Sequence, residues 1–344
     1  MEQVATIGLD IAKSVFQIHG VSANGDVVVR RRLRRAGLAA FFAALPPCLV
    51  GLEACATSHH WARVLSDLGH DVRLMPAAYV KPYVKRQKND MTDAEAICEA
   101  VTRPTMRFVP VKSAEQQSVL SLHRARDLLV RQRTSLINAL RAHLAEYGIA
   151  VAQGVAGRKL LATLVEDEEF DLIPPLARTA LLPLVDQIRA LETAAGDLEV
   201  AIRAWHRSNP TSRRLATIPG IGPITASALA ASIADPSVFR SGRHLAAWLG
   251  LTPRENSTGG KQRLGHISKQ GDPYLRRLLV VGATAVLRFT GSDRSPSSPL
   301  LIWAAQLKAR KPYKVVALSL ANKLARIAWA VMVSDDVFRR EPAR

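Results

Sequence analysis

Cysteine is scarce in this sequence, which has only Cys48, Cys55 and Cys98 among its 344 residues. The three form no CxxC pair, and no histidine follows them at the spacing of a zinc finger. The sequence therefore supports neither a disulfide framework nor a structural zinc site. This pattern is typical of a protein kept reduced inside the cell.

Long hydrophobic runs are also missing. The most apolar tract, residues 278–287, is too short to span a bilayer and is followed by Arg288. The N-terminal segment carries an acidic residue early and has no basic stretch before an apolar run, unlike a secretory signal peptide. We therefore expect a cytoplasmic protein with no membrane partner.

Acidic residues are outnumbered, with 29 Asp and Glu against 47 Lys and Arg, so the formal net charge is +18. Such an excess in a folded chain indicates a polyanionic partner, most often DNA or RNA, and a generally basic proteome is the alternative explanation. The basic residues are spread over several segments, which disfavours an anionic membrane surface. The chain is 48% hydrophobic and long enough for two or three domains.

The order of apolar patterns predicts three regions. Residues 4–33 alternate like an antiparallel meander, and strands at 48–52 and 71–75 then alternate with helices at 58–68 and 92–102. This order predicts a mixed α/β sheet with helices packed on it. Residues 113–147 and 176–205 have helical periodicity, which predicts two long antiparallel helices, either a coiled-coil arm or a plain helical subdomain. Residues 148–175 look irregular, and a mainly helical region begins near residue 212.

Carboxylates follow two apolar strands and open one helix. Asp10 and Glu53 close predicted strands, and Asp90 and Asp93 lie one turn apart at the start of a helix. Gathered together, they would repel one another unless a divalent cation neutralised them, and Mg²⁺ or Mn²⁺ bound by carboxylates is the usual arrangement for phosphoryl chemistry. Each residue also has an ordinary explanation, as a turn residue or a favourable charge at a helix N-terminus.

A glycine-containing turn follows at residues 218–223, Ile-Pro-Gly-Ile-Gly-Pro. Between two helices, Gly220 and Gly222 would expose backbone N–H groups to a DNA phosphate, as in a helix-hairpin-helix element. The alternative is a tight turn between packed helices.

A basic, glycine-rich stretch at residues 250–277 has Ser257, Thr258, Gly259 and Gly260 at its centre. Glycine allows close approach of the backbone to a ligand, and basic side chains suit a phosphate. A hydroxyl beside a bound phosphate could act as a nucleophile, but only if it is activated. By itself the stretch is better explained as a mobile basic loop that only contacts nucleic acid.

Five motifs together resemble one family. GLDIAKSVF, GLEACATS and KNDMTDAEA in the N-terminal part, with IPGIGPITA and GLTPRENSTGGKQRLGHISKQGDPYLRRLL in the C-terminal part, are similar to the IS110 family of insertion-sequence transposases, in its IS1111 subgroup. The resemblance implies a RuvC-like, RNase H-type domain at 1–111, a helical coiled-coil region at 112–210 and a C-terminal transposase domain at 211–344. It also implies a dimer or tetramer that acts on donor and target DNA with a structured non-coding bridge RNA.

The resemblance also assigns residues. Asp10, Glu53, Asp90 and Asp93 match the family's acidic tetrad, and Ser257 matches its nucleophilic serine. The motif here is Ser-Thr-Gly-Gly rather than the Ser-Gly-Ser-Ser of some members, so Thr258 stays an alternative. The expected contacts to nucleic acid are Gly220, Gly222, Arg254, Thr258, Gly259, Lys261, Arg263, Lys269 and Arg276.

The implied reaction is DNA strand exchange at a composite site. Ser257 would attack a phosphodiester and form a phosphoserine link, while Mg²⁺ or Mn²⁺ on the acids would stabilise the phosphoryl oxygens and the leaving 3′ oxygen. Two other functions fit some of these residues. One is a Holliday-junction-type nuclease that uses the acids alone, and the other is a non-catalytic nucleic-acid-binding protein. The protein is also expected to associate with the bacterial nucleoid.

Overall fold

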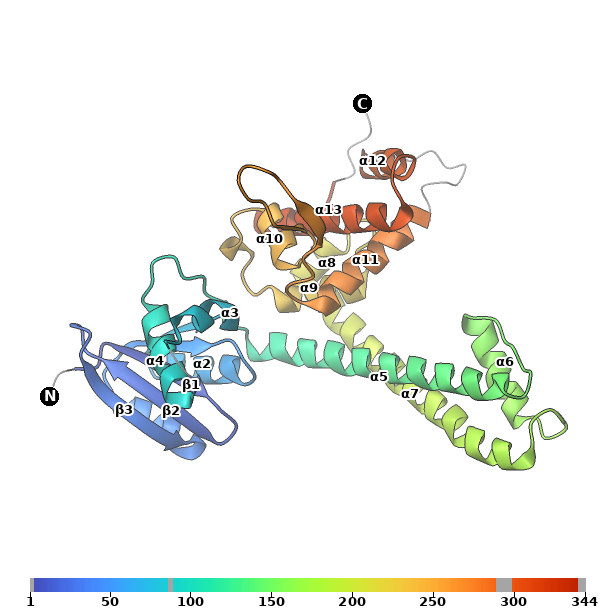
Figure 1. The fold of residues 1–344 in the computed structure, drawn as a ribbon, viewed down its shortest axis with the longest axis horizontal. Helices are drawn as coiled ribbons and strands as arrows, with labels where there is room; N and C mark the ends of the chain where they lie inside the picture. Colours follow the sequence, from blue (N-terminus) through green and yellow to red (C-terminus); the bar gives the residue numbers. More distant parts are fainter. Residues whose placement is uncertain (1–2, 86–88, 289–298, 340–344) are drawn as a thin grey trace. The chain divides into compact units, whose positions relative to one another are not determined.

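The computed structural model describes residues 3–85, 89–288 and 299–339. The chain divides into two compact units, Met1–Gln117 and Ser118–Arg344 (Figure 1). The first contains a five-stranded sheet with helices, and the second is mostly helical. The mixed α/β N-terminal part and the helical C-terminal half predicted from the sequence are therefore confirmed.

The N-terminal sheet has the order β3-β2-β1-β4-β5. β1 (Thr6–Ile11), β2 (Val15–Val21) and β3 (Val27–Arg34) form the expected antiparallel meander. β4 (Leu49–Glu53) pairs in parallel with β1, and β5 (Asp71–Met75) pairs in parallel with β4, to which it is connected by a helix, as is usual for parallel neighbours. The central strand β1 is thus paired on both sides, and its side chains alternate between the two faces of the sheet.

One face of the sheet carries the main apolar core of this unit. Ile7 and Leu9 of β1 are fully buried there together with Phe42 of α1 (Leu38–Ala43) and Leu65 of α2 (Ser58–Asp67). A short 3-10 turn, Arg35–Gly37, precedes α1. α3 (Ala77–Val80) and a second 3-10 turn, Lys81–Tyr83, follow β5.

α4 (Asp90–Val101) packs on β1, at positions that alternate with Ile7 and Leu9. It comes so close that a Cβ built on Gly8 would lie 2.1 Å from the carbonyl oxygen of Ala94 and 2.4 Å from the nitrogen of Cys98. No other residue could occupy position 8 without displacing the helix, because both neighbours are backbone atoms. Gly51 in β4 has a similar close approach, since its Cβ would lie 2.7 Å from Val101.

Two long helices form an arm in the second unit. α5 (Ala114–Ala145) and α7 (Pro175–Ser208) are antiparallel, because Arg126 pairs with Glu199 while Arg133, further along α5, pairs with the earlier Glu192. The far end of the arm buries Leu140 and Leu144 against residues of α6 (Val155–Glu166) and α7. The expectation that residues 148–175 are irregular was wrong in part, because α6 lies within them.

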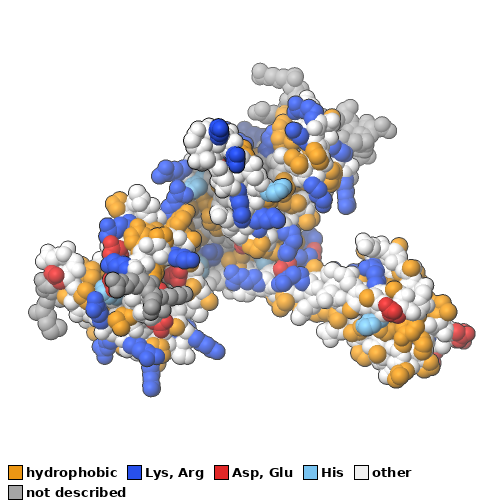
Figure 2. Space-filling model, viewed as in Figure 1, with side chains coloured by type: hydrophobic (Ala, Val, Ile, Leu, Met, Phe, Trp, Pro, Cys, Tyr) orange, Lys and Arg blue, Asp and Glu red, His pale blue; other side chains and the backbone are white. Residues whose placement is uncertain are grey.

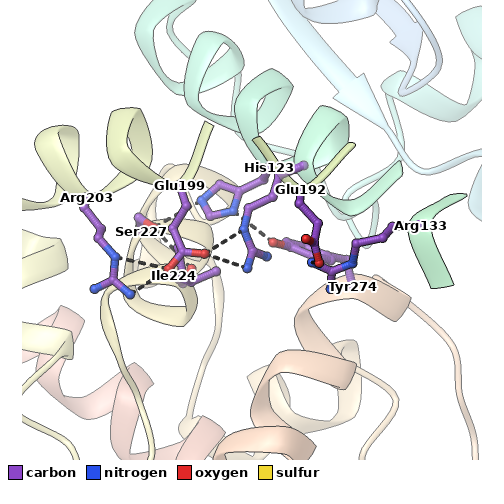
Figure 3. Close-up of polar contacts among 9 residues, drawn as sticks. His123, Arg133, Glu192, Glu199, Arg203, Ile224, Ser227 and Tyr274 are labelled. Atoms are coloured by element: carbon purple, nitrogen blue, oxygen red, sulfur yellow. Dashed lines mark hydrogen bonds and ion pairs between the residues drawn. The ribbon is translucent and has the colours of Figure 1, made fainter. Parts of the chain in front are cut away.

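A buried polar group fastens α5 to the C-terminal helices (Figure 3). His123 Nδ1 lies 3.0 Å from Tyr274 Oη, and its Nε2 lies 3.1 Å from Ser227 Oγ. The Ser227 hydroxyl donates to the carbonyl of Pro223, so Nε2 carries the imidazole proton and Nδ1 accepts from the tyrosine. Burial, helped by the charge of Arg126, lowers the pKa of His123 to about 4 and keeps it neutral.

The remaining helices form the largest apolar core of the molecule. They are α8 (Pro210–Leu215), α9 (Pro223–Ser232), a 3-10 turn (Pro236–Val238), α10 (Gly242–Trp248), α11 (Pro273–Arg288), α12 (Pro299–Lys308) and α13 (Tyr313–Ser334). Two short strands, β6 (Pro253–Glu255) and β7 (Leu264–Ile267), pair as an antiparallel hairpin at the edge of these helices (Figure 1).

α13 is the one helix among the described residues that is long and apolar enough to cross a membrane, rather than the tract 278–287 singled out from the sequence. Its apolar side is occupied within the protein. Leu320, Ala321 and Leu324 are fully buried in the C-terminal core, and Lys323 and Arg326 interrupt the helix with charge. We therefore interpret α13 as a core helix.

Candidate active site

The fold brings Asp10 and Glu53 to adjacent positions on neighbouring parallel strands. Leu9 of β1 is paired with Leu52 of β4, and each acid is the next residue in its strand. Because β1 and β4 run in the same direction, both carboxylates leave the sheet at the same edge. Asp10 also points to the α4 side of the sheet, two residues after Gly8.

The start of α4 is fixed by a capping box. Asn89 accepts hydrogen bonds from the nitrogens of Met91 and Thr92, and the Thr92 hydroxyl accepts from the Asn89 nitrogen. Asp90 and Asp93 lie in the first turn of the helix, where negative charge interacts favourably with the helix dipole. The close contact at Gly8 places this first turn beside the end of β1.

The electrostatics of Asp10 link all four acids. Its pKa is raised from 3.8 to about 6, first by burial and then by the charges of Asp93, Asp90 and Glu53. A hydrogen bond from the Ile11 nitrogen opposes this rise only in part. Cys55 responds to the same field, because burial and then Glu53 and Asp10 raise the pKa of its thiol. The four carboxylates predicted from the sequence therefore share one negative region.

The chemistry of this region fits a hard divalent cation. Carboxylate oxygens are the ligands that Mg²⁺ and Mn²⁺ take in proteins, and crowded carboxylates gain most from a cation. The side chains are within electrostatic range of one another but are not gathered to ligand distance. In the described part of the chain, no group of three or more His, Cys, Asp or Glu side chains is close enough to share an ion.

The stretch around Ser257 is a hairpin rather than an irregular loop. Gly259 and Gly260 have φ values of +54° and +74°, and the Lys261 nitrogen donates to the Thr258 carbonyl at 3.0 Å. Two consecutive positive φ values with this hydrogen bond are typical of a type I′ turn, for which Gly-Gly is well suited. These glycines are therefore explained by the turn, and a Cβ on either would meet no neighbour within 4 Å.

Ser257 lies just before this turn and its hydroxyl has two partners. Ser257 Oγ donates to Glu255 Oε1 at 2.8 Å and accepts from the Arg263 nitrogen at 3.1 Å. Ser257 and Glu255 are both exposed, so a substrate can reach the hydroxyl. Thr258 is also exposed, but its recorded hydrogen bonds are backbone bonds to Lys261. The geometry thus distinguishes Ser257 from Thr258 by a carboxylate acceptor for its proton.

The residues expected to contact nucleic acid differ in their surroundings. Lys261 and Arg263 are exposed near the hairpin turn, and Lys269 is exposed at its base. The Arg254 guanidinium donates to the Ser268 carbonyl, and that of Arg276 donates to the carbonyls of Leu249 and Gln270. Arg254 therefore joins the two strands of the hairpin at their base, and Arg276 of α11 ties the segments on either side of the hairpin to the domain.

The turn at Gly220 is packed against α11. A Cβ on Gly220, which has φ +86°, would lie 2.8 Å from the carbonyl oxygen of Gly282. Gly222 is different, because its Cβ would meet nothing within 4 Å and it caps α9. Packing alone thus accounts for Gly220, whereas the N-terminus of α9 beside Gly222 is open to a ligand.

Sequence reasoning missed Glu255. Its spacing of two residues from Ser257 would place both side chains on one face of a strand, which is a usable signal. That signal becomes visible only once residues 253–255 are known to pair with 264–267 as strands, and both are short and largely exposed.

Known proteins resemble this chain over its whole length. The family described as "Transposase IS116/IS110/IS902 family" matches residues 212–297, and a second transposase family, DEDD_Tnp_IS110, matches residues 7–149. A Pseudomonas aeruginosa protein named "Probable family 20 transposase" is 51% identical over 98% of this chain and 99% of its own. The transposase for the insertion sequence element IS1328 of Yersinia enterocolitica is 42% identical over 99% of this chain and 100% of its own. The corresponding IS1111A protein of Coxiella burnetii is 38% identical over 98% and 92%.

The raised pKa of Asp10 predicts a pH-dependent cost to folding. The folded state binds more protons than the unfolded state between pH 3.8 and about 6, so stability falls as pH rises through this window. Asp10→Asn removes the charge and should raise the free energy of unfolding at pH 7 by about 1–2 kcal/mol after discounting for partial exposure. The variant should therefore unfold at a higher temperature than the wild type at that pH. The gap should close near pH 4, as measured by thermal unfolding at both pH values.

The same pair of proteins tests the cation. Millimolar MgCl₂ at pH 7 should raise the unfolding temperature of the wild type but not that of Asp10→Asn, because binding to the folded state stabilises it. NaCl at equal ionic strength is the control for screening. Equal stability of the two proteins at pH 7 would show that Asp10 does not experience the field of the other acids.

Proposed function

The chain belongs to the IS116/IS110/IS902 family of transposases and is a DNA transposase, and on that premise we propose how it cuts and rejoins DNA. In this proposal Ser257 is the nucleophile, Glu255 is its general base, and a divalent cation is held by Asp10, Glu53, Asp90 and Asp93. The observation that carries the proposal is the hydrogen bond from Ser257 Oγ to the Glu255 carboxylate at 2.8 Å. A hydroxyl nucleophile needs such an acceptor for its proton.

The N-terminal unit is proposed to be a RuvC-like, RNase H-type domain over residues 1–111. Support comes from the sheet order β3-β2-β1-β4-β5, with an antiparallel meander followed by parallel strands, and from acids at the ends of the two central strands. Mg²⁺ or Mn²⁺ bound there would neutralise charge on the phosphoryl oxygens and the leaving oxygen. Helical residues 112–210 and a transposase domain at 211–344 complete the proposed organisation.

The proposed reaction conserves the phosphodiester energy. Ser257 Oγ bonds to the phosphorus as its proton passes to Glu255, and the bond from phosphorus to the 3′ oxygen breaks. The 3′ oxygen takes up a proton from water as it leaves and is released as a hydroxyl, the 5′ phosphate remains on the serine, and Glu255 later returns its proton to water. In the reverse step, a 3′ hydroxyl from another strand attacks this phosphate and the serine oxygen recovers a proton. No external energy source is needed, because each step exchanges one phosphate ester for another.

The proposed partners are donor DNA, target DNA and a structured non-coding bridge RNA. Basic side chains occur over much of the C-terminal unit, whereas the tip of the arm is mostly hydrophobic or uncharged (Figure 2). We propose that the side chains of Lys261, Arg263 and Lys269 contact phosphates. Further contacts are proposed through the remaining guanidinium N–H groups of Arg254 and Arg276 and through backbone groups of Gly220, Gly222, Thr258 and Gly259. This part of the proposal also places the protein in the bacterial cytoplasm, at the nucleoid.

We propose that the protein works as a homodimer or homotetramer. The arm exposes large apolar side chains around its tip, with Val155 62%, Leu172 58% and Leu176 85% exposed. Exposed apolar groups of this size favour contact with another protein surface. Such a contact between copies would bring more than one hairpin to the exchanging strands.

The serine assignment predicts a covalent adduct. Wild-type protein purified with its RNA and mixed with Mg²⁺ and DNA that spans the ends of its element should form a protein–DNA species resistant to SDS, and Ser257→Ala prepared in the same way should form none. Thr258→Ala is the matched control and should retain the adduct within a few fold. An adduct from Ser257→Ala that disappears in Thr258→Ala would move the nucleophile by one residue. Cleavage without any adduct would favour the nuclease that uses the acids alone.

The base assignment predicts a slow but correctly folded variant. Glu255→Gln keeps an acceptor for the Ser257 hydroxyl but cannot take its proton, so adduct formation should slow by about 10²–10⁴-fold. Glu146→Gln removes the same charge from an exposed position at the end of α5 and should have no effect. The rates would be measured by quenching in SDS at intervals. A wild-type rate for Glu255→Gln would exclude Glu255 as the base.

The guide proposal predicts a specific RNA partner. Full-length protein, purified from cells that carry its gene with the flanking DNA, should co-purify with one abundant RNA transcribed from the non-coding flank. Sequencing of that RNA should show segments complementary to donor and to target. RNA fragments drawn evenly from the whole transcriptome would contradict the proposal.

A further inference from the structure

A cavity lies between the hairpin and the last two helices. It has a volume of about 610 Å³ and is lined from β7 by Gly265, His266 and Ile267, from α12 by Trp303, and from α13 by several residues that include Asn322, Lys323 and Arg326. Asn322 fastens this wall to the base of the hairpin, because its Nδ2 donates to the Leu251 carbonyl at 3.2 Å. The cavity is therefore partly formed by the strand that supports Ser257.

The lining is basic and aromatic. It contains Lys323, Arg326 and His266, but no aspartate or glutamate. Lys323 Nζ lies 4.2 Å from the centroid of the Trp303 ring, and partial burial together with the charge of Arg326 lowers the pKa of this lysine. Two cations crowded at one wall without a carboxylate in the lining gain from an anion, and if the Lys323 ammonium turns from the ring to that anion, the indole face it covers is open to a planar group.

The size of the cavity limits what can enter. Its volume is within the range of pockets that enclose small organic molecules and far exceeds that needed for an inorganic anion alone. A nucleotide combines the two features that the lining would recognise, a phosphate for the lysine and arginine and a base for the aromatic wall. Stacking of a base on an aromatic side chain needs no particular sequence.

The cavity is also near the proposed nucleophile. Arg263, whose nitrogen donates to Ser257 Oγ, is two residues before Gly265 in the same chain segment. At the rise of an extended strand, this separation is about 7 Å. A strand whose phosphate lies at Ser257 can therefore place a neighbouring nucleotide at the cavity.

We propose that this cavity binds one unpaired nucleotide of the DNA strand presented to Ser257, with its phosphate on Lys323 and Arg326 and its base against Trp303. The pocket would hold the strand in register beside the hairpin. Only the identity of the strand rests on the proposed nucleophile, because binding of an unpaired nucleotide needs neither Ser257 nor a metal ion.

Binding to a fluorescent oligo(dT) of twelve nucleotides tests the pocket. Full-length Ser257→Ala protein, freed of co-purified nucleic acid and kept in EDTA, provides the background. Adding Lys323→Gln should weaken binding by about tenfold, and the loss of one phosphate contact should reduce the slope of log K against log salt by about 0.7. Lys314→Gln, on the same helix but outside the lining, removes the same charge and should change affinity by less than twofold. Equal effects of the two substitutions on affinity and slope would overturn the proposal.

Photocrosslinking gives a second test that needs no substitution in the pocket. Oligo(dT) carrying one 5-iodouracil should crosslink to the peptide that contains Trp303, as identified by mass spectrometry. Crosslinks confined to other peptides would overturn the proposal. An effect of Lys323→Gln seen with oligo(rU) of equal length but not with oligo(dT) would overturn the assignment to DNA. The adduct test of Ser257 is unaffected by any of these results.

Discussion

The close contact between α4 and β1 is the constraint on which the N-terminal site depends. It exists because Gly8 leaves room for the backbone of Ala94 and Cys98, at distances that no Cβ could tolerate. This contact sets the first turn of α4, with its two aspartates, beside the end of β1. The parallel pairing of β1 with β4 adds Glu53. The resulting field is visible in the raised pKa of Asp10, which means that the fold gives up stability to gather negative charge.

The C-terminal site depends on the two glycines of the hairpin turn. Gly259 and Gly260 make the turn that returns the chain, so that the Arg263 nitrogen reaches Ser257 Oγ and Glu255 lies on the other side of the same hydroxyl. Arg254 links the two strands at the base of the hairpin, and Arg276 binds the carbonyls of Leu249 and Gln270 on either side of it. In the proposed mechanism, the two units have separate roles, because one supplies a cation site and the other supplies a nucleophile with its own base.

Much of the N-terminal site could be predicted because strand ends are readable from the sequence. An apolar run that stops at an acid, as at Asp10 and Glu53, indicates that the acid lies at the end of a strand. The hairpin could not be read in the same way, since β6 and β7 are three and four residues long and lack apolar alternation. Helix α6 was missed because residues 148–175 have glycines in their first part, two prolines at their end and an acidic patch between them. Glu255 was missed because its contact with Ser257 becomes apparent only when β6 and β7 are known to pair.

The central claim is that the four acids form one electrostatic site, and the carboxyl carbon of Asp10 reports on it directly. A ¹³C NMR titration of the metal-free protein should place the Asp10 pKa near 6. Asp93→Asn should lower this pKa, because the charge of Asp93 raises it more than the charge of Asp90 or Glu53 does. A titration of Asp10 near 3.8 in the wild type, unchanged by Asp93→Asn, would contradict the account.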